Sequence, residues 1–121
     1  MKWIRLTSEA QFNELLKRSA ETPQLIFKYS SRCGLSDRIK ERLENYPTTS
    51  AFVFYFLDIL SFRGLSNKIA AAFAVHHESP QVLLIQNREC IYEESHNAIR
   101  METILHEAGL EQNVPGVRGL L

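Results

Sequence analysis

A single cysteine stands where the chain is suited to thiol chemistry. Cys33 lies in the segment KYSSRCGLSD, between the apolar run of residues 25–27 and a pattern of apolar residues at helical spacing. The run predicts the end of a buried strand, and the pattern predicts a helix that begins beside the cysteine. Because a helix N-terminus carries unpaired N–H groups and a partial positive charge, it favours the anionic form of a thiol. The thiolate is the nucleophile, so this position predicts a reactive cysteine.

The residues around Cys33 are small or polar, which distinguishes it from a cysteine that packs in a core. An inert free cysteine behaves as a small apolar residue and is often buried. Here the N–H groups of Leu35 and Ser36 are expected to point at the sulfur, and Arg32 and the Ser36 hydroxyl add to the effect. We therefore predict Cys33 as the catalytic residue, with its neighbours in the substrate site: Ser31, Arg32, Gly34, Leu35 and Ser36.

The positions of the two cysteines predict a monothiol mechanism. A dithiol redox protein would have its second cysteine at position 36, where this chain has serine. The other cysteine, Cys90, is predicted just past a hairpin turn, about four residues or ~13 Å from the active end of the sheet. A disulfide requires Cα atoms within about 7 Å of each other. We therefore interpret Cys90 as a packing residue and expect Cys33 to exchange with an outside thiol.

The segment His77-Glu78-Ser79-Pro80 is predicted to bind the substrate. Pro80 opens an expected strand, and a cis bond before it would expose the backbone groups of Ser79 to an extended disulfide substrate. An X-Pro bond is usually trans, with cis in only about 5–6% of cases; the order of the elements raises this proportion considerably, but the sequence does not decide between cis and trans. The neighbouring histidines His76 and His77, without further clustered ligands, do not indicate a metal site and are commonly surface loop residues.

A second helix start is predicted at Ser95-His96-Asn97, on the side where the last strand returns toward the cysteine. Its free N–H groups and the His96 side chain are expected to hold a carboxylate of a small thiol. Simple N-capping by Ser95 or Asn97 is an equally good interpretation, and both can hold at once.

The elements that position these residues alternate between strands and helices and end in a hairpin. Strands are expected at residues 3–6, 25–29, 52–58, 81–86 and 90–93, and helices between Ser8 and Thr22 and at 34–46, 62–74 and 97–108. The order βαβαβαββα predicts an α/β domain with a central mixed sheet flanked by helices. A thiol corner between strand and helix, followed later by an X-Pro before a hairpin, is the order of the thioredoxin fold. Residues 1–110 are expected to form this thioredoxin-like domain, with a flexible C-terminal tail at 111–121.

Composition narrows the classes of function. The chain has 121 residues, of which 45% are hydrophobic and 23% charged, and its formal net charge is zero at pH 7. This balance argues against disorder and provides no electrostatic reason to expect a nucleic acid partner. The longest apolar run, residues 51–57, is far shorter than the ~20 residues that span a bilayer, and no signal peptide pattern is present. We expect a cytoplasmic protein without membrane partners.

Three segments together resemble the monothiol bacilliredoxins, thioredoxin-fold proteins of the bacillithiol redox system. They are residues 30–36 around the cysteine, the segment at 77–82 with its His-Glu-Ser-Pro-Gln pattern, and the Ser95-His96 pair after the hairpin. They span nearly all of residues 1–108 in the right order and spacing. Family members commonly have Cys-Pro-Ile-Ser, whereas this chain has Cys-Gly-Leu-Ser, a difference that bears on substrate preference and redox poise.

The resemblance implies a thiol-disulfide oxidoreductase that removes bacillithiol, or another low-molecular-weight thiol, from mixed disulfides on proteins. Cys33 would attack the bacillithiol sulfur and release the protein thiol. The implied partners are S-thiolated proteins, the low-molecular-weight thiol as co-substrate, and a thioredoxin-like or flavin reductase. No tightly bound cofactor and no metal are expected.

Two alternatives remain open at this point. The Cys-Gly-Leu-Ser sequence also resembles the Cys-Gly-Phe-Ser of monothiol glutaredoxins, which hold a [2Fe–2S] cluster with glutathione. The glycine pair and aspartate with which those proteins bind glutathione are absent, and residues 95–97 occupy that region. The other alternative is a non-catalytic adaptor that kept the thioredoxin fold.

Overall fold

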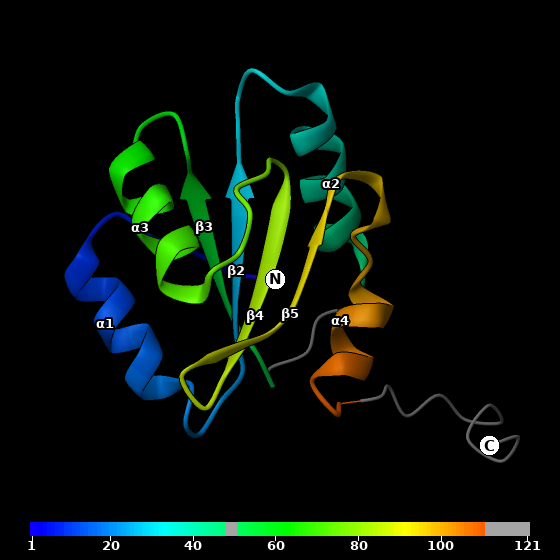
Figure 1. The fold of residues 1–121 in the computed structure, drawn as a ribbon. Helices are drawn as coiled ribbons and strands as arrows, with labels where there is room; N and C mark the ends of the chain where they lie inside the picture. The colour runs from blue at the N-terminus through cyan, green and yellow to red at the C-terminus, as the bar shows by residue number, and fades with distance from the viewer. Residues whose placement is uncertain (48–50, 111–121) are drawn as a thin grey trace, which may run out of the picture.

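Strands and helices follow one another in the predicted order, βαβαβαββα (Figure 1). The computed structural model describes residues 1–47 and 51–110. The strands are β1 (Trp3–Arg5), β2 (Gln24–Tyr29), β3 (Val53–Asp58), β4 (Gln81–Gln86) and β5 (Glu89–Ser95). The helices are α1 (Glu9–Arg18), α2 (Gly34–Asn45), α3 (Arg63–Phe73) and α4 (Met101–Glu107), with a 3-10 turn, η1 (His96–Ala98), before α4. The tail predicted at 111–121 lies outside the described residues.

The five strands form one mixed sheet in the order β1-β3-β2-β4-β5. Strands β1, β3 and β2 are parallel, whereas β4 runs antiparallel to β2 and β5 antiparallel to β4. In this register Lys28 lies opposite Gln81, and Gln81 lies opposite Ser95. The end of β2, the start of β4 and the end of β5 therefore meet at one edge of the sheet, and all three predicted site segments lie beyond that edge.

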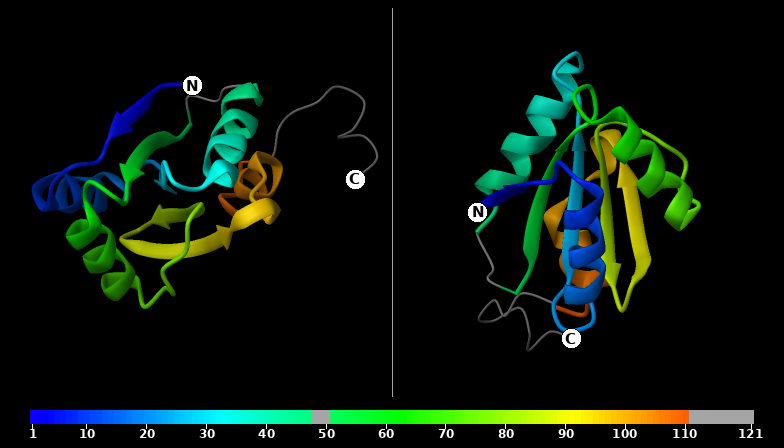
Figure 2. Two further views of the ribbon diagram at one scale, coloured as in Figure 1. Left: turned by 90° about the horizontal axis from the view of Figure 1, so that it is seen from above. Right: turned by 90° about the vertical axis from the view of Figure 1, so that its left-hand side faces the viewer.

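Helices cover both faces of the sheet and create two apolar cores (Figure 2). One core lies between the sheet and the pair α2 and α4, and the other lies between the sheet and the pair α1 and α3. Strands β2 and β4 are buried over most of their length because each face contacts a helix layer. No helix within the described residues is long and apolar enough to cross a membrane.

The capping box predicted at the start of α1 forms in part. The Ser8 hydroxyl accepts a hydrogen bond from the Gln11 N–H at 3.1 Å, as a capping box requires. The Gln11 side chain, however, accepts from the N–H of Thr7 at 2.7 Å rather than from that of Ser8. The hydrogen bond from the backbone to the Gln11 side chain is thus shifted by one residue. The motif still satisfies two backbone N–H donors, those of Gln11 and Thr7.

The single helix predicted at residues 97–108 is wrong, because the chain forms η1 and α4 with an extended break between them. Ile99 and Arg100 have extended backbone, with ψ of 119° and 136°. The guanidinium of Arg42 in α2 donates to the carbonyls of Asn97 and Ile99 at 2.8 and 2.9 Å. Those carbonyls would accept intrahelical bonds in a continuous helix, so a contact from a distant element competes with the local pattern.

Candidate active site

The predicted reactive cysteine lies at the N-terminus of α2, as the sequence indicates. Cys33 is the N-cap residue of the helix and has extended backbone, with φ −115° and ψ 108°. It is half-buried, while Ser31, Arg32 and Gly34 beside it are exposed. A Cβ added at Gly34 would meet no atom within 4 Å, so the space above this first helical residue is open to solvent and to a substrate.

The hydrogen bonds expected at the sulfur do not form. The side chain of Cys33 makes no capping hydrogen bond within the described part of the chain. The N–H of Ser36, which was expected to point at the sulfur, donates instead to the Cys33 carbonyl at 2.9 Å. Leu35 contributes to packing, because its side chain lies against the core beneath α2 and α4. The sulfur therefore lies at the positive end of the helix, where a substrate can reach it.

Ser36 joins the two loops on either side of the cysteine. Its side chain is fully buried, and its hydroxyl accepts a hydrogen bond from the N–H of Ser30 at 3.2 Å. The same hydroxyl lies 3.5 Å from the hydroxyl of Ser79. Ser36 stands at the position where a dithiol protein has its second cysteine. It therefore connects the thiol corner (residues 30–36) to the proline loop (residues 76–80).

The bond between Ser79 and Pro80, whose isomer the sequence left open, is cis. Strand β4 begins only at Gln81, so Ser79 lies just outside the hydrogen-bonded sheet. The carbonyl of Pro80 accepts a hydrogen bond from the N–H of His96 at 2.9 Å. The proline loop is therefore held between the thiol corner on one side and the end of β5 on the other.

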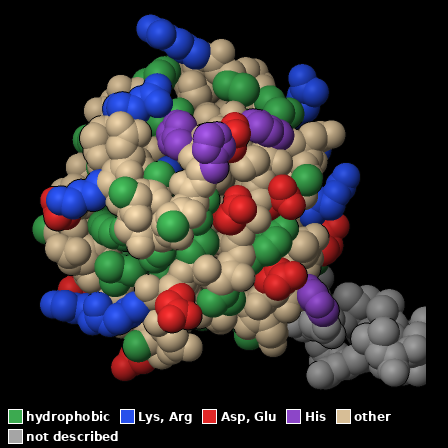
Figure 3. Space-filling view, viewed as in Figure 1, with side chains coloured by type: hydrophobic (Ala, Val, Ile, Leu, Met, Phe, Trp, Pro, Cys, Tyr) green, Lys and Arg blue, Asp and Glu red, His purple; other side chains and the backbone are tan. Residues whose placement is uncertain are grey.

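Glu78 lies between two histidines on the surface beside the proline. Its carboxylate is 3.2 Å from Nε2 of His96 and 3.5 Å from Nε2 of His76. Figure 3 shows histidine side chains gathered at this end of the molecule. Within the described residues, no group of His, Cys, Asp and Glu side chains is arranged to hold a metal ion. The Glu78 carboxylate thus connects the proline loop to His96 at the start of η1.

The second helix start predicted at Ser95-His96-Asn97 is wrong in its details. The segment forms a three-residue 3-10 turn, and Ser95 makes no side-chain capping bond. Two of its N–H groups already have partners, since that of Ser95 donates to the Glu94 carboxylate at 3.0 Å and that of His96 donates to the Pro80 carbonyl at 2.9 Å. His96 has a φ of +58°, which removes the helical conformation that the prediction required. Its imidazole is exposed and remains available for a substrate carboxylate.

His77 points away from this surface cluster and toward α3. Its Nδ1 lies 3.4 Å from the hydroxyl of Ser66, and its Nε2 lies 3.4 Å from the guanidinium of Arg63. Burial lowers the pKa of His77 below its usual value, and the positive charges of Lys28 and Arg63 lower it further. A neutral ring is therefore favoured at this end of the proline loop.

Cys90 lies far along β5 from the thiol corner. It is five residues from Ser95, the end of β5 that reaches the site, which corresponds to roughly 16 Å at ~3.3 Å per residue. Its thiol donates to the carbonyl of Tyr92 at 3.4 Å and packs against the core beneath α1 and α3. Burial raises the pKa of Cys90 to about 11, so this thiol is a poor nucleophile.

The sequence analysis missed a set of buried polar residues under the proline loop. Lys28, Ser66 and Gln81 are all fully buried and connect the sheet and α3 to residues 76 and 77. The sequence signal for these residues was a lysine and a glutamine in otherwise apolar strands. Polar residues are common near strand ends, so this signal did not indicate that they are buried.

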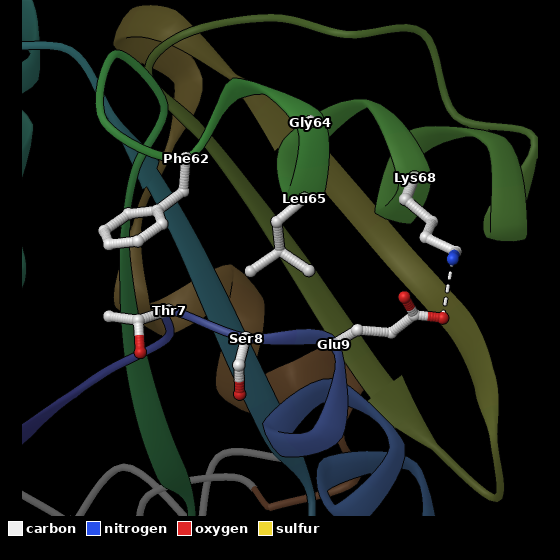
Figure 4. Close-up of a pocket in the computed structure, with 7 residues that line it drawn as sticks. All are labelled: Thr7, Ser8, Glu9, Phe62, Gly64, Leu65 and Lys68. Atoms are coloured by element: carbon white, nitrogen blue, oxygen red, sulfur yellow. Dashed lines mark ion pairs between the residues drawn. The ribbon is translucent and has the colours of Figure 1, made fainter.

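A hollow of about 460 Å³ lies elsewhere, between the N-termini of α1 and α3 (Figure 4). Phe62 and Leu65 form its apolar wall, and an ion pair of 2.6 Å between Glu9 and Lys68 spans one side. None of the predicted site residues lines it.

Comparison with known proteins agrees with this geometry. Residues 4–104 match the family model described as monothiol bacilliredoxin BrxC. A solved thioredoxin-fold protein, described provisionally as an oxidoreductase, is 25% identical with a TM-score of 0.77, covering 87% of this chain and 92% of its own.

Two thioredoxins share the fold at lower identity. The thioredoxin of Malassezia sympodialis is 14% identical with a TM-score of 0.70, covering 89% of this chain and 90% of its own. Spinach chloroplast thioredoxin f is 11% identical with a TM-score of 0.66, covering 87% and 88%. These similarities show the thioredoxin fold, a mixed sheet flanked by helices, as the element order predicts.

Proposed function

We propose, because the chain belongs to the monothiol bacilliredoxin family, that it removes bacillithiol or a similar low-molecular-weight thiol from mixed disulfides on proteins. Family membership and the thioredoxin-fold oxidoreductase neighbour support the broader role of a thiol oxidoreductase. What we propose beyond this role is the identity of the thiol that is removed and the mechanism of its removal. The proposed location is the cytoplasm.

The reaction is an exchange of sulfur partners that leaves the total number of disulfides unchanged. The thiolate of Cys33 attacks the bacillithiol sulfur of the mixed disulfide, and the bond between the two substrate sulfurs breaks. The target protein leaves as a thiolate and takes up a proton, while Cys33 becomes joined to bacillithiol. A second thiolate, from free bacillithiol or from a thioredoxin-like or flavin-dependent reductase, then attacks the bacillithiol sulfur and releases Cys33.

The observation that carries the proposal is one half-exposed thiol at a helix N-terminus beside a cis proline, without a second thiol in reach. Cys33 begins α2, and Ser36 contacts the residue before Pro80. The chain's other cysteine, Cys90, lies on the far part of β5 with a raised pKa. Because no internal thiol can resolve the mixed disulfide, the intermediate must wait for an outside thiol.

The proline loop supplies a place for the substrate backbone. Ser79 lies outside the hydrogen bonds of β4, so an extended segment of the target protein can pair with it next to the sulfur. Arg32 and His96 are both exposed, and their side chains can interact with the carboxylates of a small thiol. These contacts would orient the disulfide for attack by Cys33.

The test is transfer of bacillithiol from a modified protein, followed by intact mass spectrometry and peptide mapping. The wild-type chain should gain the mass of one bacillithiol on Cys33 while the target loses it. Cys33→Ser should abolish transfer, and the matched control Cys90→Ser should keep it. Modification of Cys90 instead, or loss of transfer only in Cys90→Ser, would refute the assignment. Absence of any transfer would favour the alternative that this chain is a non-catalytic adaptor with a thioredoxin fold.

A further inference from the structure

A fully buried lysine lies beneath the proline loop. Lys28 is in β2, on the sheet face covered by α1 and α3, and none of its surface is exposed. Lysine is almost never fully buried unless it is paired. Its ammonium donates to the backbone carbonyl of Ser66 at 3.1 Å, and no carboxylate among the described residues forms an ion pair with it. The mechanism above does not use this charge.

Gln81 lies directly opposite Lys28 on the neighbouring strand and shares its environment. Residues paired in this way project from the same face of the sheet. The buried Gln81 amide donates to the carbonyl of His76 at 2.9 Å and to the hydroxyl of Ser95 at 3.5 Å. Its Oε1 is buried without a partner among the described residues. Lys28 thus holds α3, while Gln81 holds the proline loop and the end of β5.

The contacts of His77 favour one tautomer of its ring. Arg63 only donates hydrogen bonds, so the His77 Nε2 that lies 3.4 Å from it must be the unprotonated nitrogen. The proton is then on Nδ1, which donates to the Ser66 hydroxyl at 3.4 Å. Lys28 contacts the carbonyl of this same Ser66 from below. Protonation of Nε2 would place an N–H against the guanidinium and break the contact with Arg63, whereas the Nδ1–H would keep its contact with Ser66.

The charges that face His77 come from several elements. Lys28 in β2 and Arg63 in α3 oppose its protonation, and so does His76 on its own loop. Glu78, the next residue, favours protonation, but its carboxylate is directed at His76 and His96. The two cations on the α3 side therefore dominate the electrostatics at the ring.

We propose that Lys28 is a positioning residue for thiol exchange, whose buried ammonium, together with Arg63, keeps His77 as the neutral tautomer that anchors the proline loop to α3. The inference rests on the proposed function. The anchored loop carries Ser79, which contacts Ser36 at the thiol corner. Loss of the anchor lets the substrate-binding backbone move relative to Cys33, and a displacement of ~1 Å can lower a rate by up to about a hundredfold.

The experiment compares Lys28→Met with the wild type, using Lys68→Met on α3 as a control for removing an exposed lysine. The titration of His77 is followed by NMR, its signal assigned by its loss in His77→Gln. In Lys28→Met the His77 midpoint should move to higher pH and kcat/KM for bacillithiol transfer should fall on the order of tenfold. The acid limb of the rate profile should move to higher pH with the His77 midpoint, and Lys68→Met should show neither change.

A second variant separates charge from hydrogen bonding. Lys28→Gln keeps a donor for the Ser66 carbonyl but removes the charge, so it should shift the His77 titration as Lys28→Met does while losing less activity. An unchanged His77 titration in both variants would overturn the proposal. A shifted titration with wild-type rates would refute the positioning role alone. If the wild-type chain transfers no thiol, the proposed function fails and the positioning role fails with it.

Discussion

Replacing the buried lysine by an apolar residue should make the protein more stable while making it slower. Burial, followed by the charge of Arg63, lowers the pKa of Lys28 from 10.5 to about 8 in the folded protein. At about 1.4 kcal/mol for each pKa unit, holding the ammonium in the folded state costs up to ~3 kcal/mol relative to the unfolded chain. Lys28→Met removes this cost, and methionine is close to lysine in length and suits an apolar core.

The lost hydrogen bond offsets part of the gain. The bond from Lys28 to the Ser66 carbonyl contributes about 1 kcal/mol. The net increase in the free energy of unfolding at pH 7 is therefore about 1–2 kcal/mol. For a domain of this size, each kcal/mol changes Tm by roughly 5 °C, so we expect a rise of about 5–10 °C.

The dependence on pH has a definite sign. Because the pKa of Lys28 is lower in the folded protein, the unfolded chain holds the proton more tightly between about pH 8 and 10.5. The wild-type protein should therefore gain stability as pH rises through this window, relative to Lys28→Met, which has no proton to lose. Below about pH 8 the contribution of the Lys28 titration to this difference should be constant and largest.

Urea unfolding followed by circular dichroism at pH 7, 8, 9 and 10 measures this difference directly. Subtracting the two proteins cancels the titration of tyrosines and of Cys90, which both contain. Lys68→Met, which removes an exposed lysine, should show no comparable stabilisation. The buried charge does not destabilise the folded protein as proposed if Lys28→Met is less stable than the wild type at pH 7. The same holds if the difference between their free energies of unfolding does not shrink toward pH 10.

Two further predictions concern the serine and the second cysteine. Ser36→Ala leaves the N–H of Ser30 without its acceptor in a buried site, which should lower the free energy of unfolding by about 1–3 kcal/mol; an unchanged urea midpoint would contradict this. Burial raises the pKa of Cys90 from 9.0 to about 11, so at pH 8 its thiolate should be about a hundredfold rarer than that of an unperturbed thiol. Iodoacetamide labelling with peptide mapping should modify Cys33 long before Cys90, and equal labelling would rule out this protection.

Local patterns were sufficient to predict the order of the elements and the corner that holds the thiol. Strand-favouring runs and helical spacing depend on residues close in sequence, and so does the position of Cys33 before α2. At the last predicted helix, prediction and structure differ because of a distant side chain. Arg42 of α2 binds the carbonyls of Asn97 and Ile99, and the helix expected there is divided.

The chain's own order of residues thus determined that this is a thioredoxin-fold protein with one thiol at a helix start and a proline before a strand. Only the tertiary structure decided that Lys28 lies opposite Gln81 and beneath Ser66, because these contacts depend on the antiparallel register of β2 and β4 and on the packing of α3. A lysine within a strand has no partner that spacing along the chain can identify. Lys28 becomes buried only when the helices cover the sheet. This burial is what lowers its pKa from the ordinary value of a lysine.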